Sequence, residues 1–232
     1  MKRKQKILIG SLLMGAAITV TGYFGIRFEM NRRVMEREAS KQGLQCLWRI
    51  DGQHEVTYTP SWWQVIRGAR PTDIHLEWPA FESDHQATQE YAAALRFFGT
   101  LESVSVGYSC PEVMTLLTGL GGQPHLTQLN CFHAPVTDEI SEVLLGFPHL
   151  QGISLVPAQF TAQGFPAMAN LEAADFSFCP ISVNGLRAIA ASPKLTVIKL
   201  SNHPHPTQSL RAAVVAVRVS RPSLDIWGIE PH

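Results

Sequence analysis

The sequence repeats one line five times between residues 101 and 200. The five lines are Leu101-Glu-Ser-Val104-Ser-Val106, Leu126-Thr-Gln-Leu129-Asn-Cys131, Leu150-Gln-Gly-Ile153-Ser-Leu155, Leu171-Glu-Ala-Ala174-Asp-Phe176 and Leu195-Thr-Val-Ile198-Lys-Leu200. Each reads apolar-x-x-apolar-x-apolar, and successive lines begin 25, 24, 21 and 24 residues apart. The alternation at the end of each line predicts a half-buried strand, and a fixed period of this length indicates a solenoid of stacked units.

A helical pattern follows most of the lines. Apolar residues recur there at i, i+3, i+4 and i+7, as in Val113, Leu116, Leu117 and Leu120, then Ile140, Val143, Leu144 and Phe147, and later Leu210, Ala213, Val214 and Val217. A Thr or Ser precedes these stretches where a helix N-cap is expected, at Thr137, Thr161, Ser182 and, more loosely, Thr207. Each unit is therefore predicted to contribute one strand and one helix.

These motifs resemble the leucine-rich repeat superfamily, in its ribonuclease-inhibitor-like branch. Besides the five lines, the resemblance is carried by Pro-Val-Thr-Asp-Glu at 135–139, Pro-His-Leu at 124–126 and 148–150, and Pro-Lys-Leu at 193–195. The resemblance implies an α/β fold, a right-handed βα superhelix with about six or seven parallel strands on its concave side. The unit after Thr161 is about three residues short, so we expect its helix to be a single turn.

The N-terminal region predicts attachment to a membrane. Residues 1–6 form a basic tail, and residues 7–26 carry no charge over a length that can span the hydrocarbon core of a bilayer as a helix. We interpret residues 7–26 as an uncleaved transmembrane helix, a signal anchor, with a cleaved signal peptide as the alternative. Residues 27–43 are strong helix formers and predict a helical stalk. The basic tail favours a single-pass topology with the later residues outside the cytoplasm.

Residues 44–72 predict an N-terminal cap for the solenoid. Alternating residues on both sides of Asp51-Gly52 indicate a hairpin, and Pro60-Ser-Trp-Trp63 begins a short helix. The repeat domain then occupies residues 73–232, from a first strand at 74–78 to a last one at 224–227. This layout is similar to that of membrane-anchored bacterial leucine-rich repeat proteins.

The sequence carries little that indicates catalysis. A formal net charge of zero argues against a nucleic-acid partner. The four cysteines, Cys46, Cys110, Cys131 and Cys179, include no C-x-x-C pair, and His203-Pro-His205 lacks further ligands for a metal. A Cys110–Cys131 disulfide stays conceivable outside the cytoplasm. We therefore expect a non-enzymatic protein without a metal, a cofactor or a small-molecule substrate.

The predicted function is recognition of a partner protein by the concave face, and the sequence does not identify that partner. Side chains that alternate away from the core provide the candidate site, namely Tyr108, Phe132, His133, Asp175, Phe178 and Lys199. Exposed aromatic rings are enriched at binding hot spots, although the same rings could instead pack beneath the strand ends. The alternative function is a structural or scaffolding envelope protein with no discrete ligand.

Overall fold

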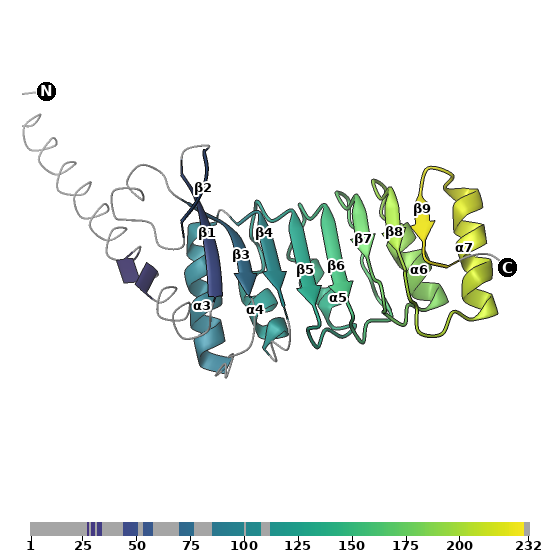
Figure 1. The fold of residues 1–232 in the computed structure, drawn as a ribbon, viewed down its shortest axis with the longest axis horizontal. Coiled ribbons are helices and arrows are strands. Elements are labelled where there is room, and N and C mark those ends of the chain that lie inside the picture. The colour runs from purple at the N-terminus through teal and green to yellow at the C-terminus, as the bar shows by residue number, and fades with distance from the viewer. Residues whose placement is uncertain are drawn as a thin grey trace, which may run out of the picture.

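The computed structural model describes residues 27, 29–30, 32–33, 44–50, 53–57, 70–76, 85–99, 101–107 and 112–229. Its strands form one nine-stranded sheet in the order β2-β1-β3-β4-β5-β6-β7-β8-β9. Every pairing from β3 onward is parallel, and each strand in that run lies next to its successor in the chain (Figure 1). The chain therefore builds the sheet by adding one strand per unit, as a solenoid does.

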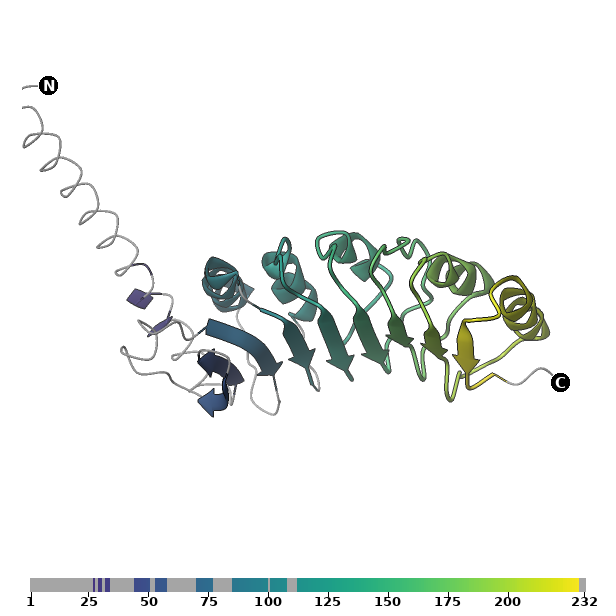
Figure 2. The ribbon, with the colours of Figure 1, turned by 90° about the horizontal axis from the view of Figure 1, so that it is seen from above.

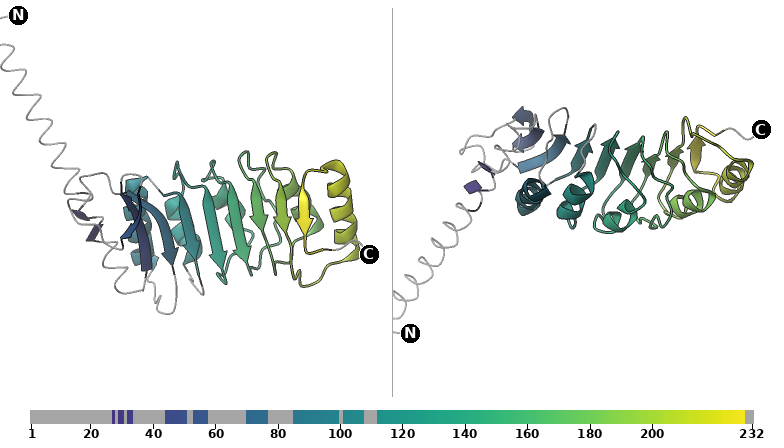
Figure 3. Two further views of the ribbon diagram at one scale, coloured as in Figure 1. Left: turned by 45° about the horizontal axis from the view of Figure 1, so that its top comes forward. Right: turned by 90° about the horizontal axis from the view of Figure 1, so that it is seen from below.

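The parallel strands follow the repeated lines. They are β3 (Arg70–Leu76), β4 (Ser103–Val106), β5 (Gln128–Phe132), β6 (Gly152–Val156), β7 (Ala173–Asp175), β8 (Val197–Lys199) and β9 (Asp225–Trp227). The turned view in Figure 3 (left) shows them side by side along the molecule.

The helices lie on one side of the sheet, and among the residues that the structure describes no helix lies against the other side, called the open face below (Figure 2). They are α3 (His85–Phe98), α4 (Val113–Leu120), α5 (Ile140–Leu144), α6 (Val183–Ala190) and α7 (Gln208–Ser220). The strands line the inner side of a shallow arc, and the helices lie on its outer side.

The core lies between the sheet and the helices. The middle apolar residues of successive lines are paired in register, and each is at most 3% exposed: Val104, Leu129, Ile153, Ala174, Ile198 and Ile226. The leucines that begin the lines are equally buried, with Leu101, Leu126, Leu150 and Leu171 at 0%. Full burial of one such side chain stabilises the fold by about 1.5–3 kcal/mol. The strand pattern predicted from the sequence is confirmed.

The helical pattern is confirmed only in part. The stripes of α4 and α7 are buried as predicted, at Val113, Leu116, Leu117 and Leu120 and at Leu210, Ala213, Val214 and Val217. In contrast, α5 ends at Leu144, and Phe147 is buried in the turn that follows it. Residues 157–172 contain turns and no helix, so the predicted single helical turn after Thr161 is wrong.

Of the four predicted N-caps, two are present and two are not. Ser182 Oγ accepts the Gly185 N–H at 2.9 Å and caps α6, and Thr207 caps α7 through the Leu210 N–H at 3.2 Å. Thr137 caps nothing, because α5 begins only at Ile140 and its N-cap residue makes no side-chain bond. Thr161 begins no helix.

Two side chains tie neighbouring units together. The guanidinium of Arg221 donates to four backbone carbonyls that follow or end α6, those of Ala190, Ser192, Pro193 and Leu195. Asp138 accepts both the backbone N–H (2.9 Å) and the hydroxyl of Thr161 (2.5 Å) in the next unit. Such bonds to charged groups are about twice as strong as neutral ones, so both side chains strengthen the contact between units.

The predicted hairpin is present, and it extends the sheet. β1 (Leu44–Ile50) pairs antiparallel with β2 (Gln53–Thr57) on one side and with β3 on the other. The basic tail, the predicted span at 7–26, the Trp-rich helix, Tyr108 and Cys110 lie outside the described residues. No helix within the described ranges combines the length and the apolar character that crossing a membrane requires.

Candidate recognition surface

The open face of the sheet carries the side chains that alternate away from the core. In β5 the alternation is complete, because Leu129 and Cys131 are buried while Gln128, Asn130 and Phe132 reach the surface. Small residues leave space between the larger ones, since a Cβ on Gly152 would meet the Gln128 amide at 2.1 Å. The amide end of the Gln128 side chain therefore lies over Gly152 of β6.

Phe132 and Phe178 are the most exposed of the predicted rings that the structure describes. Phe132 ends β5 and is 38% exposed, and Phe178 follows β7 and is 51% exposed. Neither ring belongs to the buried core, so the prediction that they face solvent fits the structure better than packing beneath the strand ends. Tyr108, the third predicted ring, lies outside the described residues.

Phe178 is held in a costly backbone conformation. Its φ of 62° lies in the left-handed region, as do the φ of His133 (57°) and of Asn202 (55°), which occupy the same place after their own strands. Asparagine adopts this conformation readily, whereas a bulky side chain pays about 1–2 kcal/mol for it. The Phe178 N–H bonds to the Ser201 carbonyl at 2.9 Å, so the pairing of neighbouring units keeps the residue in place.

Asp175 and Lys199 lie opposite each other on β7 and β8. Asp175 Oδ1 accepts the backbone N–H of Ser177 at 3.0 Å and the Ser177 hydroxyl at 2.7 Å, which orients the carboxylate. The ammonium of Lys199 lies 3.9 Å from Asp175 Oδ2, too far for a hydrogen bond, and its side chain is 50% exposed. This exposed pair contributes little to stability, and both groups keep hydrogen-bonding capacity for a ligand.

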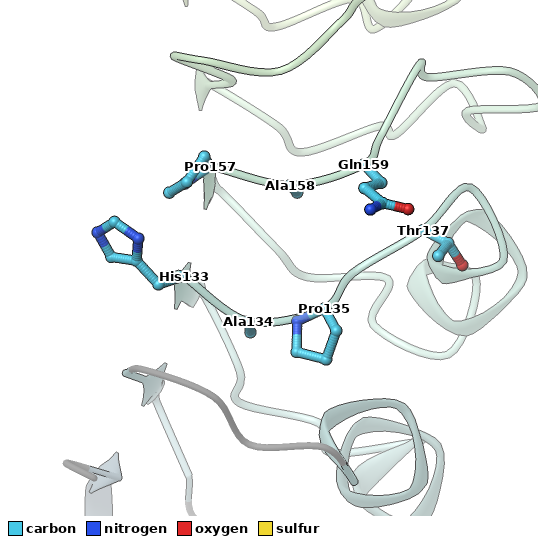
Figure 4. A pocket seen from close by; sticks show the side chains of 7 residues that line it. All are labelled: His133, Ala134, Pro135, Thr137, Pro157, Ala158 and Gln159. Atoms are coloured by element: carbon cyan, nitrogen blue, oxygen red, sulfur yellow. The ribbon is translucent and has the colours of Figure 1, made fainter. Parts of the chain in front are cut away.

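A groove between two neighbouring loops begins at His133 (Figure 4). The groove measures about 550 Å³ and is lined by His133, Ala134, Pro135, Thr137, Pro157, Ala158 and Gln159. In Figure 4 the His133 imidazole and Pro157 stand at the strand ends, and Thr137 and Gln159 lie toward α5. Its walls are mainly apolar, with an imidazole and an amide as the polar groups, which suits binding of an apolar side chain.

Trp227 is a surface residue that the sequence reasoning missed. It lies on β9 opposite Lys199 and is 58% exposed. The last line, Leu224-Asp-Ile226-Trp227, lacks one residue at its start relative to the others, which hid the equivalence with the place of Lys199. The five predicted residues that the structure describes fall into two groups. Phe132 and His133 lie at the end of β5, and Asp175, Phe178 and Lys199 lie beyond β6, on and after β7 and β8.

The other residues considered for catalysis or metal binding make contacts that stabilise the fold. Cys179 is fully buried, its thiol donates to the Leu155 carbonyl at 2.8 Å, and burial raises its pKa to about 11. His203 Nδ1 accepts the His205 N–H at 3.2 Å, so its Nε2 carries a hydrogen and donates to the Ile181 carbonyl at 3.0 Å. Within the part of the chain that the structure describes, no three His, Cys, Asp or Glu residues are placed to hold a metal.

The open face thus offers aromatic rings, an oriented carboxylate, an ammonium and a row of small polar side chains. These groups stack, accept and donate hydrogen bonds, and pair with charges, which is the chemistry of recognition. No protein-family model matches this chain, and no curated protein sequence matches it either.

Proposed function

We propose that the chain is a membrane-anchored leucine-rich repeat protein whose open sheet face binds a partner protein. The repeat proposal is supported by strands that pair in register at the spacing of the repeated lines, with helices on the opposite side. The anchor proposal rests on the uncharged residues 7–26 and the basic tail before them. In this proposal the protein crosses the membrane once, its repeat domain lies outside the cytoplasm, and it is not an enzyme.

Phe178 is the observation that carries the binding proposal. Its ring is 51% exposed and its backbone is left-handed, so the residue gains little from burial and pays for its conformation. Strained residues of this kind are concentrated at sites with a function. Phe132 on β5 and Trp227 on β9 add two further exposed rings, both turned away from the core.

Phe178→Asn separates binding from folding. Asparagine suits the left-handed backbone, as Asn202 does at the equivalent place, so we expect the melting temperature to stay unchanged or to rise slightly. Loss of a hot-spot ring should weaken capture of the partner by at least about tenfold. The measurement is quantitative capture from detergent-solubilised membranes with the full chain, together with thermal melting of each variant.

Leu145→Asn is the matched control. Leu145 is 70% exposed at the end of α5, on the outer side of the arc, and its backbone is right-handed. It should leave both capture and melting unchanged. Undiminished capture by Phe178→Asn would contradict the proposed binding face. A wild-type chain that enriches no protein would favour the structural envelope role instead.

A further inference from the structure

The chain directly after the uncharged stretch is helical where the structure describes it, at Arg27, Glu29, Met30, Arg32 and Arg33. The side chains of these residues differ in how far they are exposed to solvent. Met30 is 63% exposed and the side chain of Arg33 is 74% exposed, whereas those of Glu29 and Arg32 are 29% and 24% exposed. One side of this segment is therefore partly covered, and the other presents cationic and apolar groups.

The charges in this segment are arranged around one carboxylate. Glu29 accepts two bonds from Arg32, both of 2.9 Å, and one from Arg33 of 2.8 Å. These bonds, that from Arg32 first, lower the pKa of Glu29 to about 2, so the carboxylate stays ionised. Three arginines against one glutamate leave the described part of the segment with a net positive charge.

The first residue of the segment already contacts the repeat domain. The guanidinium carbon of Arg27 lies 6.0 Å from the centre of the Phe97 ring, in the last turn of α3. A cation over an aromatic face at this distance is an attractive contact. Figures 1 and 2 show the purple residues of the segment beside α3. Arg96, next to Phe97, is also exposed, so a further cation lies at the same end of α3.

This contact determines how far α3 lies from the end of the proposed membrane span. A free helical stalk of residues 27–43 would carry the repeats about 25 Å away from its start, at 1.5 Å per residue. The contact with Phe97 is instead made by Arg27, the residue that follows the uncharged stretch directly. If residues 7–26 span the bilayer, Arg27 lies at the depth of the lipid headgroups, and the last turn of α3 lies there with it.

We propose that Arg27, Arg33 and Arg96 rest on anionic phospholipid headgroups and so dock the first unit of the solenoid on the membrane. This inference depends on the proposed membrane anchor. A guanidinium donates a pair of parallel hydrogen bonds to a phosphate, and each basic residue near an anionic membrane strengthens association about fivefold. The solenoid is then held by its N-terminal end and extends away from that contact, with its open face unobstructed.

The test uses the full chain in vesicles of phosphatidylcholine and phosphatidylglycerol that contain a trace of phospholipid with a photoreactive headgroup. After illumination, mass spectrometry locates the lipid adducts. We expect adducts in residues 27–33 and 94–98, none in α6 or α7, and a loss of the 94–98 adducts in vesicles of phosphatidylcholine alone or at high salt.

A charge-neutral variant and a matched control sharpen the result. Arg33→Gln with Arg96→Gln should lower the adduct yield at 94–98 about 25-fold, about fivefold for each charge, since glutamine keeps the helix and removes the charge. The control, Arg187→Gln with Lys194→Gln, removes the same charge from exposed positions in the unit of α6 and should leave the yield unchanged.

Extraction with alkaline carbonate tests the membrane anchor separately from the docking of α3 on the headgroups. Release of the wild-type chain by carbonate overturns the anchor and the docking together. A chain that resists extraction but gives no adducts at 94–98, or equal adducts on neutral and anionic vesicles, overturns the docking alone. Acidic protein captured by the cations in place of lipid would overturn it as well.

Discussion

The unit between β6 and β7 and the unit between β7 and β8 support the same strand pairing with different outer sides. From Ala174 to Ile198 the chain builds α6, whose buried Leu186 and Ile189 face the sheet. From Ile153 to Ala174 it is three residues shorter and builds no helix. Both pairs of strands stay in register. The strand line thus defines the unit, and its outer side can be filled in more than one way.

Three phenylalanines fill the space where the helix is missing. Phe160, Phe165 and Phe176 are at most 4% exposed, and their ring centres lie 5.2–6.1 Å apart in edge-on or tilted arrangements. Such pairs are favourable beyond the apolar area that they bury. Two rings from the loop, Phe160 and Phe165, pack with Phe176 of the strand line and replace the aliphatic stripe of a helix.

The short unit also lets its neighbour approach closely. A Cβ on Gly185 in the first turn of α6 would lie 2.2 Å from the Thr161 carbonyl. The backbone of the short unit fits against α6 only because this position is glycine. Asp138 holds the other side of the short unit through Thr161, so the segment is fixed from both neighbours.

The largest expected effect comes from removing one ring of the short unit. Phe160→Ala should lower the free energy of unfolding by about 3–5 kcal/mol, because it leaves a cavity among Phe165, Phe176 and the sheet. Urea denaturation of the full chain in detergent, followed by circular dichroism, measures this change.

Phe132→Ala is the control for Phe160→Ala, since the same ring is lost from a position that is 38% exposed. Its cost should stay near or below about 1 kcal/mol. Equal shifts for the two variants would show that the rings do not replace the helix.

A smaller effect distinguishes the two units by their cap positions. Ser182→Ala removes the bond to the Gly185 N–H and should cost about 1 kcal/mol. Thr137→Val, at the corresponding place before α5, should be neutral or stabilise by up to about 1 kcal/mol, because Thr137 Oγ1 is buried without a hydrogen-bond partner. Thermal melting checks both variants, and a loss of stability in each would restore Thr137 as a cap.

The sequence predicted the strands better than the helices for a physical reason. Leu129, Ile153 and Ile198 face a core that accepts only apolar groups, so their spacing is visible in the residue types. The N-cap at Thr137 was wrong because residues 137–142 form i to i+3 turns, and Asp138 turns its carboxylate to the next unit instead. Such a contact across units leaves no local pattern.

The surface was harder to predict than the core. Phe132 could be placed on the open face from the alternation alone, whereas Phe178 has the same parity as the buried Ala174 and Phe176. Trp227 was missed because its line is one residue short, and the left-handed backbone at Phe178 depends on pairing with the next unit. No feature of the sequence near Arg27 indicated that the segment contacts α3.

The smallest expected effect concerns pH and the third link across the short unit, the bond from the Cys179 thiol to the Leu155 carbonyl. Burial raises the pKa of Cys179 from 9.0 to about 11, so between these values the folded state keeps a proton that the unfolded state loses. Stability from this group is therefore fully present below pH 9 and declines as the pH rises toward 11. At pH 10 the loss should be about 1 kcal/mol. Serine makes the same bond and does not titrate in this range. We therefore compare the unfolding free energies of the wild-type chain and of Cys179→Ser at pH 8 and at pH 10. Their difference should shift by that amount, in favour of the serine variant at pH 10. A difference that stays constant with pH would mean that the thiolate forms as easily in the folded chain as in the unfolded one, and that the short unit admits water at Cys179.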